Sequence, residues 1–227
     1  IKIYGATEYK KKLLNNYINI KLHKKLFQGN SSLYVKKFLN LEKKRNSDII
    51  EIHNRPKYLE LINKNSKAKI FLYFHNDPLS MSGSKTTIER INLLKNSDKI
   101  IFNSNWSKKR FLTNLNNRDY EDKLITIYQS ASKTKINFNK KEKLISFIGK
   151  LNVAKGYDLF GASIIKILNK HEDWKAVVIG DEPREKINFE HKNLKILGFK
   201  SHNYILNILK KVSISVVCSR WDEPFGR

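Results

Sequence analysis

Two lysines flank a short loop in the second half of the sequence, between a predicted strand and a predicted helix. In the segment LISFIGKLNVAKGYDLFG, Gly149 ends an apolar run, and Lys150 and Lys155 flank the loop that follows. Gly156 then precedes the helix. A helix N-terminus offers unpaired N–H groups and a partial positive charge, to which two ammonium groups add their own charge. The pattern predicts a diphosphate site, and the alternative is a loop with two solvated lysines in a lysine-rich chain.

A second polar loop follows an apolar run at the end of the sequence. In SISVVCSRWDEPFGR, Glu223 comes after a predicted strand, and Phe225 and Gly226 come next. An ionised carboxylate has two strong acceptor oxygens for sugar hydroxyls. A glycine at the opening of a helix lets the backbone approach a phosphate closely. The pattern predicts a sugar and phosphate site, and the alternative is an exposed turn.

Polar residues also follow the predicted strands of the first half. His75 comes after KIFLYF, His53 and Arg55 lie at the end of DIIEIHNR, and Ser104 ends KIIFNS. Open parallel sheets bind ligands outside the carboxyl ends of their strands. We therefore predict a ligand site at these strand ends, with His75 as its main residue. The alternative for each of these residues is a satisfied side chain in a polar loop.

The elements that must position these residues are short apolar runs alternating with segments of helical period, which is typical of βαβ units. We predict two Rossmann-like α/β domains, residues 1–135 and 143–227, joined by the polar linker 136–142. We also predict a helix over 86–98 with Ile88, Ile91 and Leu94 facing the core, and two further helices capped by Asp158 and Ser201. The predicted strands are 1–5, 48–53, 69–75, 99–104, 124–129, 144–149, 174–180, 194–199 and 213–218. The apolar stripe of the helix capped by Asp158 is predicted to consist of Leu159, Ala162, Ile165 and Leu168. That of the helix capped by Ser201 is predicted to consist of Ile205, Leu209 and Val212.

The chain has 227 residues, 45 Lys plus Arg and 21 Asp plus Glu, for a formal charge of +24. Residues 1–142 carry 30 basic and 12 acidic side chains, whereas residues 143–227 carry 15 and 9. This excess indicates either an anionic partner or a compositional bias. The single cysteine, Cys218, excludes an internal disulfide, favours a reducing compartment and is predicted to lie in a buried strand. No apolar stretch is long enough to span a bilayer.

The order GKLNVAKG, VVIGD, LKILGF and VVCSRWDEPFGR resembles the donor-binding half of the group 1 (family four) glycosyltransferases, which have the GT-B fold. The resemblance covers about 85 residues and places the family's two diphosphate ligands on Lys150 and Lys155. It places the first motif glutamate on Glu223, and the second would be residue 231. Lysine at 150 replaces the usual arginine and lacks its planar fork. In the first half, the resemblance makes His75 the histidine beside the transferred sugar, while QSAS at 129–132 departs from the family pattern.

The resemblance implies a retaining, metal-independent glycosyltransferase whose co-substrate is a nucleotide-diphosphate sugar, with no cofactor. His75 and Glu223 are its catalytic candidates, Lys150, Lys155, Gly149, Phe225 and Gly226 would bind the donor, and His53, Arg55 and Ser104 would lie on the acceptor side. Because the sequence begins at Ile1 and stops at Arg227, we expect a fragment in which both domains are incomplete.

The family resemblance also implies a partner, because the acceptor would be a cell-envelope glycan or a lipid-linked molecule. The basic charge of the first half predicts electrostatic contact with anionic lipid. The expected location is therefore cytoplasmic or peripheral on the inner membrane face. The alternatives are a sugar-nucleotide epimerase of the same fold and a basic nucleic-acid-binding protein. The chain lacks a recognisable nucleic-acid-binding motif, so specific nucleic acid is not an expected partner.

Overall fold

The computed structural model describes residues 1–6, 15–22, 29–115, 118–130, 135–185 and 187–225. The chain divides into two compact units. Unit 1 comprises Ile1–Ser130 with Pro224–Arg227, and unit 2 comprises Ala131–Glu223. Within the described ranges, no helix reaches the length and apolarity that crossing a membrane requires.

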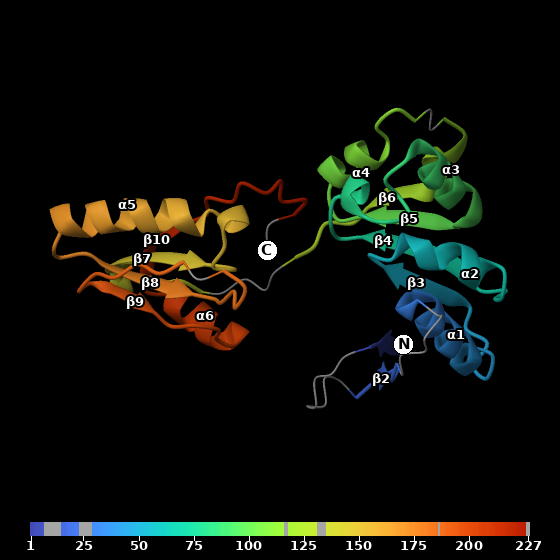
Figure 1. Ribbon diagram of the computed structural model, residues 1–227, viewed down its shortest axis with the longest axis horizontal. Coiled ribbons are helices and arrows are strands. Elements are labelled where there is room, and N and C mark those ends of the chain that lie inside the picture. Colours follow the sequence, from blue (N-terminus) through green and yellow to red (C-terminus); the bar gives the residue numbers. More distant parts are fainter. Residues whose placement is uncertain (7–14, 23–28, 116–117, 131–134, 186, 226–227) are drawn as a thin grey trace. The chain divides into compact units, whose positions relative to one another are not determined.

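Unit 1 contains a four-stranded parallel sheet of order β3-β4-β5-β6 and a small parallel pair, β1-β2 (Figure 1). With η marking 3-10 helices, its elements are β1 (Ile3–Gly5), β2 (Tyr17–Asn19), α1 (Asn30–Glu42), β3 (Ile49–His53), η1 (Pro56–Tyr58), α2 (Leu59–Asn63), β4 (Lys69–Phe74), η2 (Pro78–Ser80), α3 (Thr87–Asn96), β5 (Lys99–Phe102), α4 (Asn105–Phe111), η3 (Arg118–Lys123) and β6 (Leu124–Thr126).

Alternation along the strands of unit 1 directs one row of side chains into its core. In β4, Ile70, Leu72 and Phe74 are buried, and Ile50 and Ile52 of the neighbouring β3 join the same cluster. The residues between them point to the other side, because side chains alternate along a strand. The parallel pairing of β3 with β4, in which His53 lies opposite Tyr73, places the carboxyl ends of these two strands next to each other.

Unit 2 contains a four-stranded parallel sheet of order β10-β7-β8-β9. Its elements are η4 (Phe138–Lys140), β7 (Glu142–Ile148), η5 (Val153–Lys155), α5 (Tyr157–Lys170), β8 (Lys175–Ile179), β9 (Leu194–Ile196), α6 (His202–Leu209) and β10 (Val212–Val216). The predicted linker 136–142 thus contains η4, and its last residue begins β7.

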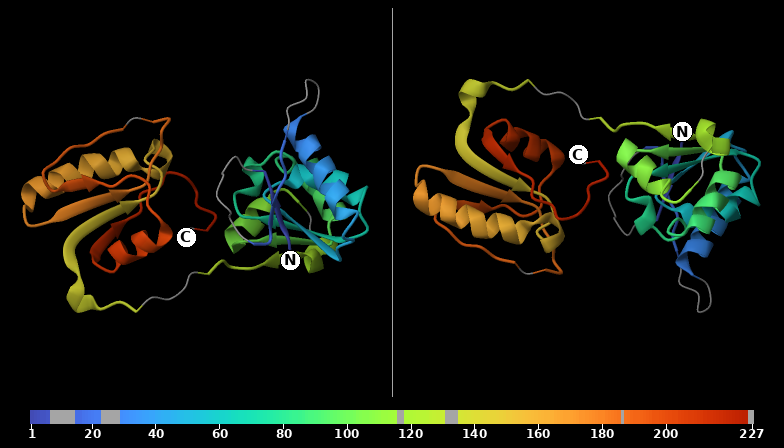
Figure 2. Two further views of the ribbon diagram at one scale, coloured as in Figure 1. Left: turned by 90° about the horizontal axis from the view of Figure 1, so that it is seen from below. Right: turned by 90° about the horizontal axis from the view of Figure 1, so that it is seen from above.

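The two helices of unit 2 cover opposite faces of its sheet (Figure 2). Phe160 and Ile164 of α5 pack with Val178, whereas Ile205 and Leu209 of α6 pack with Ile179. Val178 and Ile179 are successive residues of β8 and therefore point to different faces. A parallel sheet covered on both faces by its crossover helices confirms the predicted α/β class.

Several local predictions are confirmed, with boundaries moved by a few residues. Every predicted strand is present, although most end one to three residues earlier because the chain turns into loops at the carboxyl ends. Ser201 caps α6, and its hydroxyl accepts a hydrogen bond from the Tyr204 amide. Helix α3 begins with a capping box in which Thr86 and Glu89 bind each other's backbone amides.

Other local predictions are wrong. Asp158 does not cap α5, because Gly156 adopts the left-handed conformation and the helix starts at Tyr157. The core-facing stripe of α5 is formed by Phe160, Ile164 and Leu168, so Leu168 is buried as predicted whereas Leu159 is 46% exposed. In α3 Leu94 is buried as predicted, but its buried neighbours are Arg90 and Leu93, and Ile88 is exposed. Cys218 is only half-buried and lies after β10 rather than within it.

Candidate functional site

The loop that carries the two predicted diphosphate lysines closes tightly between β7 and α5. Gly149 follows β7, and its amide binds the Ile179 carbonyl at the end of β8. Asn152 caps η5, since its side-chain oxygen accepts from the Lys155 amide at 3.0 Å. Gly156 then has a φ of 73°, which glycine adopts without steric cost. Lys155 is therefore held in a short turn directly before the N-terminus of α5.

The polar loop after β10 forms hydrogen bonds with this turn, although the two segments are far apart in sequence. The amides of Arg220 and Trp221 both bind the Ala154 carbonyl, at 3.0 and 3.2 Å. The Arg220 guanidinium forms two hydrogen bonds to the Asp158 carboxylate, at 2.6 and 2.8 Å, which lower the pKa of Asp158. Cys218 donates to the Gly156 carbonyl at 3.1 Å, and burial raises the pKa of its thiol. The two loops thus form one structure.

Lys155 and Glu223 form an ion pair where the two loops meet. Each side chain is 32% exposed, so the pair faces solvent on one side. Ser219 donates a hydrogen bond to the same carboxylate oxygen of Glu223 at 3.1 Å. The structure therefore brings together a cation and a carboxylate from the two motifs, beside a helix N-terminus. This set can bind an anion through Lys155 and accept hydrogen bonds from hydroxyl groups through Glu223.

Lys150 is exposed and lies near a second acidic group, Glu182, in the loop after β8. Two hydrogen bonds from Arg184, at 2.6 and 2.8 Å, lower the pKa of Glu182 to about 2, and the charge of Lys150 contributes to this shift. Lys150 thus stands at the carboxyl ends of β7 and β8, beside a carboxylate that stays ionised. Of the other predicted donor residues, Phe225 belongs to the segment 224–227 of unit 1, and Gly226 lies outside the described residues.

In unit 1, His53 and His75 meet at the carboxyl ends of β3 and β4. Nδ1 of His53 lies 2.8 Å from Nε2 of His75. The outer nitrogen of His53, Nε2, lies 3.2 Å from a carboxylate oxygen of Glu51. The outer nitrogen of His75, Nδ1, lies 2.8 Å from the amide nitrogen of Gln129. The four side chains form one hydrogen-bonded row, Glu51–His53–His75–Gln129.

The backbone around His75 is held from both sides. The Asn54 side chain accepts from the His75 amide at 2.7 Å, and the Asn103 amide donates to the His75 carbonyl at 2.8 Å. The Tyr73 ring lies stacked with both imidazoles, at centroid distances of 4.4 Å to His75 and 5.3 Å to His53. Burial, with Glu51 as a second cause, raises the pKa of Tyr73. His75 is therefore fixed in position and in ring plane.

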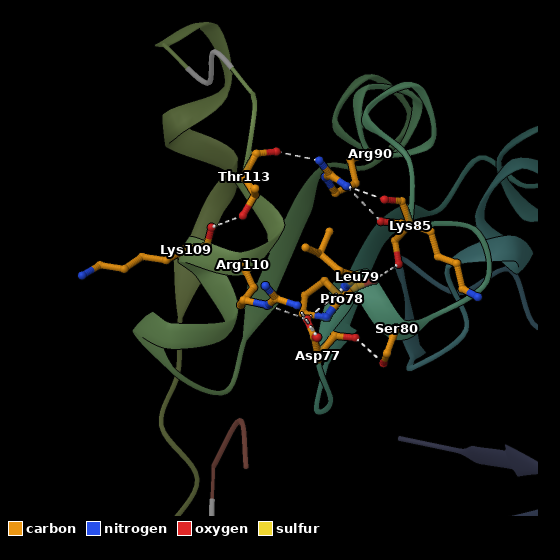
Figure 3. Close-up of polar contacts among 10 residues, drawn as sticks. Asp77, Pro78, Leu79, Ser80, Lys85, Arg90, Lys109, Arg110 and Thr113 are labelled. Atoms are coloured by element: carbon orange, nitrogen blue, oxygen red, sulfur yellow. Dashed lines mark hydrogen bonds and ion pairs between the residues drawn. The ribbon is translucent and has the colours of Figure 1, made fainter. Parts of the chain in front are cut away.

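Two arginines anchor the loop that follows His75 (Figure 3). Arg110 of α4 pairs with Asp77, whose carboxylate lies 2.9 Å from the guanidinium. Arg90 is only 3% exposed and donates to the carbonyls of Lys85 at 2.8 Å and Thr113 at 2.7 Å. Buried carbonyls need hydrogen-bond donors, so a guanidinium can hold several loop segments at once. The start of the loop is thus bound to α4 and its end to α3.

The two remaining acceptor-side candidates have local roles in the structure. Arg55 is exposed and donates to the Asn54 carbonyl at 2.8 Å. Ser104 is buried and caps α4, since its hydroxyl accepts from the Ser107 amide at 3.1 Å. Neither belongs to the hydrogen-bonded row that contains His53 and His75.

Among the residues of these sites that the sequence interpretation missed are Glu51, Arg220 and Gln129. Glu51 precedes His53 by two residues and therefore lies on the same face of β3. The two-residue period of a strand could have identified Glu51 as a neighbour of His53. Arg220 and Gln129 gave no such signal. Arg220 reaches Asp158 across 62 positions and Gln129 reaches His75 across 54.

Residues 129–227 match the model of the family described as Glycosyl transferases group 1. No match was found among curated proteins. Solved glycosyltransferase structures share the fold. A glycosyltransferase from Rickettsia africae ESF-5 is 20% identical with a TM-score of 0.64, over 93% of this chain and 62% of that one.

Two further solved structures are similar. Anabaena Alr3699/HepE, in complex with UDP-glucose, is 16% identical with a TM-score of 0.63, over 93% of this chain and 62% of that chain. The lipopolysaccharide outer core galactosyltransferase WaaB, in its apo form, is 16% identical with a TM-score of 0.57, over 92% and 60%. This chain therefore spans less than two thirds of the length of each of them. Its fold is that of the GT-B glycosyltransferases, and its residues 129–227 match the model of the glycosyl transferases group 1 family.

Proposed function

We propose that this protein transfers a sugar from a nucleotide-diphosphate sugar to an acceptor. The observation that carries the proposal is the meeting of Lys155 and Glu223 before the N-terminus of α5, in the region that matches the family. The similarity to a structure that holds UDP-glucose supports this class of donor. A second cation, Lys150, stands at the ends of the neighbouring strands.

The proposed chemistry assigns a role to each of these groups. When the bond between the sugar and the diphosphate breaks, negative charge develops on the leaving diphosphate. Lys150, Lys155 and the amide groups of the helix N-terminus stabilise that charge. Glu223 then accepts hydrogen bonds from sugar hydroxyls. Because Lys155 and Glu223 bind each other, a diphosphate competes with Glu223 for the Lys155 ammonium and frees its carboxylate for the sugar.

His75 is the proposed residue for orienting the transferred sugar or its acceptor. It lies at the carboxyl edge of its sheet, where such folds bind ligands, and its backbone is held by Asn54 and Asn103. A group held in this way acts through proximity and orientation. We further propose retention of configuration, transfer without a metal or cofactor, and a cell-envelope glycan or lipid-linked acceptor. The similarity to a lipopolysaccharide galactosyltransferase supports this acceptor class.

Replacing Lys150 or Lys155 with alanine is expected to weaken the binding of UDP or GDP. Each loss should be about 1–3 kcal/mol, the range for hydrogen bonds to charged groups, or roughly fivefold to 150-fold in Kd. Isothermal titration of each variant measures it. Lys170→Ala is the matched control, because it removes the same charge at the opposite end of α5. Unchanged titrations in both lysine variants would contradict the diphosphate assignment.

Glu223→Gln separates binding from support of the loop in the same titrations. The variant keeps the Lys155 charge and removes its competitor, so UDP affinity should stay equal or rise. Its affinity for the UDP-sugar relative to UDP should fall, because an amide is a weaker acceptor than a carboxylate. If Glu223→Gln instead lost UDP binding as Lys155→Ala does, the pair would serve only to hold the two loops together.

We also propose that the basic first half draws the protein to anionic membranes. Lys36, Lys43, Lys44 and Arg45 are exposed on α1 and just after it, while the further lysines at 10–12, 24 and 25 lie outside the described residues. Each basic residue near an anionic surface adds on the order of 1 kcal/mol, and the attraction decays within a Debye length. The location proposed is therefore the inner face of the membrane.

Vesicle sedimentation tests this proposal. The protein should sediment with anionic vesicles at low salt and should not bind neutral vesicles. Salt on the order of a few hundred millimolar should release it from the anionic vesicles, because ions screen the attraction. Changing Lys43, Lys44 and Arg45 together to glutamine should weaken sedimentation more than the same change at Lys166, Lys170 and Lys175 of unit 2. Equal binding to neutral and anionic vesicles would indicate that the lysines reflect composition alone.

A further inference from the structure

The row Glu51–His53–His75–Gln129 contains two imidazoles whose proton positions are set by the groups at its ends. A neutral imidazole has one N–H donor and one acceptor nitrogen, and the partner of one nitrogen decides which is which. In this row both nitrogens of each histidine have a neighbour within 3.2 Å. The tautomer of one histidine therefore determines that of the other.

The carboxylate at one end gives the row its direction. An ionised Glu51 can only accept, so in a neutral His53 Nε2 carries the proton and Nδ1 accepts. That acceptor requires a proton on Nε2 of His75, which leaves Nδ1 of His75 as an acceptor. The other end agrees, because the Gln129 amide nitrogen, a donor, lies 2.8 Å from this Nδ1.

We propose that Glu51, His53 and Gln129 are positioning residues that hold His75 in the tautomer with Nε2 protonated and Nδ1 accepting. Nδ1 of His75 then accepts from the Gln129 amide, and a ligand group that binds this atom must replace that amide. Like that amide, this group must be a hydrogen-bond donor, such as a sugar hydroxyl. A phosphate or carbonyl oxygen is itself an acceptor and could not form a hydrogen bond with Nδ1 in this tautomer. The part of this inference that concerns the substrate rests on the proposed function, whereas the tautomers do not.

Nitrogen NMR of histidine-labelled protein tests the tautomers without any donor or acceptor molecule. It distinguishes a ring nitrogen that carries a proton from one that does not. At about pH 8, above the usual histidine pKa, both His53 and His75 should carry their proton on Nε2. Glu60→Gln on α2 is the matched control, since it removes one exposed carboxylate of unit 1 outside the row and should change neither histidine.

A double variant, Glu51→Gln with Gln129→Glu, exchanges the two ends of the row and keeps its overall composition. The introduced carboxylate at position 129 can only accept, so His75 should now carry its proton on Nδ1, and His53 should follow. A purely structural role predicts no such reversal. A wild-type His75 with its proton on Nδ1, or a double variant with unchanged tautomers, would overturn the proposal.

Kinetics of the double variant test the substrate part of the inference. The reversed His75 offers a donor where a hydroxyl must donate, so turnover should fall at least tenfold while UDP affinity stays within twofold of wild type. Full turnover by a double variant with reversed tautomers would overturn the assignment of Nδ1 to a donor group. Failure of the proposed function itself would show differently, as loss of the lysine effects on UDP binding with the tautomers unchanged.

Discussion

Gly156→Ala is expected to destabilise unit 2 and to abolish the binding of nucleotide diphosphates. Gly156 has a φ of 73°, and a Cβ at this position would lie 2.0 Å from the Cys218 carbonyl oxygen. The left-handed conformation costs a non-glycine residue about 1–2 kcal/mol. The overlap with backbone adds about 1–3 kcal/mol, the usual cost of overpacking. To relieve it, the turn that holds Lys155 must separate from the loop that holds Glu223.

Gly198→Ala provides a matched control for this prediction. Gly198 also has a positive φ, of 67°, but a Cβ there would meet no atom within 4 Å. The free energy of unfolding of this variant should therefore fall only by the cost of the left-handed conformation, and the variant should bind UDP normally. Denaturant unfolding and UDP titration of both variants make the comparison. Equal losses of stability in the two variants would show that the contact with Cys218 does not constrain the loops.

His75→Ala is expected to lower turnover by about 10²–10⁴-fold, the range for a positioned acid, base or hydrogen-bonding group in a transition state. Affinity for the donor should change little, because the groups that we propose to hold its diphosphate, Lys150 and Lys155, belong to unit 2. A group that acts mainly in the transition state lowers kcat rather than ground-state binding. Turnover with a nucleotide sugar and its acceptor, together with UDP titration, separates these effects.

His202→Ala is the control for the histidine prediction, because this exposed residue at the start of α6 belongs to neither site. It should keep wild-type turnover. Wild-type turnover in His75→Ala as well would assign His75 to the satisfied polar-loop role that the sequence also allowed.

The sequence by itself determined every strand of the described residues except the short β2, and the places where polar residues follow the strands. In a chain where apolar runs of four to eight residues alternate with segments of helical period, each run is most readily accommodated as a buried strand. Parallel strands end at the same edge, so His53, His75, Lys150 and Glu223 had to lie at carboxyl edges once the strands were identified. Ser201 was also readable, because a cap is a local interaction between neighbours in sequence.

The start of α5 shows where local reasoning fails. Asp158 has the side chain of a good cap, yet the helix begins earlier because Gly156 can adopt a left-handed conformation against Cys218, a residue 62 positions away. The helical period is the same wherever the helix begins. The choice of Leu159 as a core residue was nevertheless wrong by one position. Because successive side chains of a helix are about 100° apart, this error places Leu159 outside the core-facing stripe.

Only the tertiary structure decided which polar groups bind one another. Lys155 and Glu223 are 68 positions apart, and His75 and Gln129 are 54 apart. The direction of a side chain at the end of a strand depends on the backbone of the loop that carries it, and that backbone is held by distant segments, through Arg220 in one unit and Asn103 in the other. Periodicity describes only neighbours along the chain, so it can place a residue at an edge but cannot choose its partner.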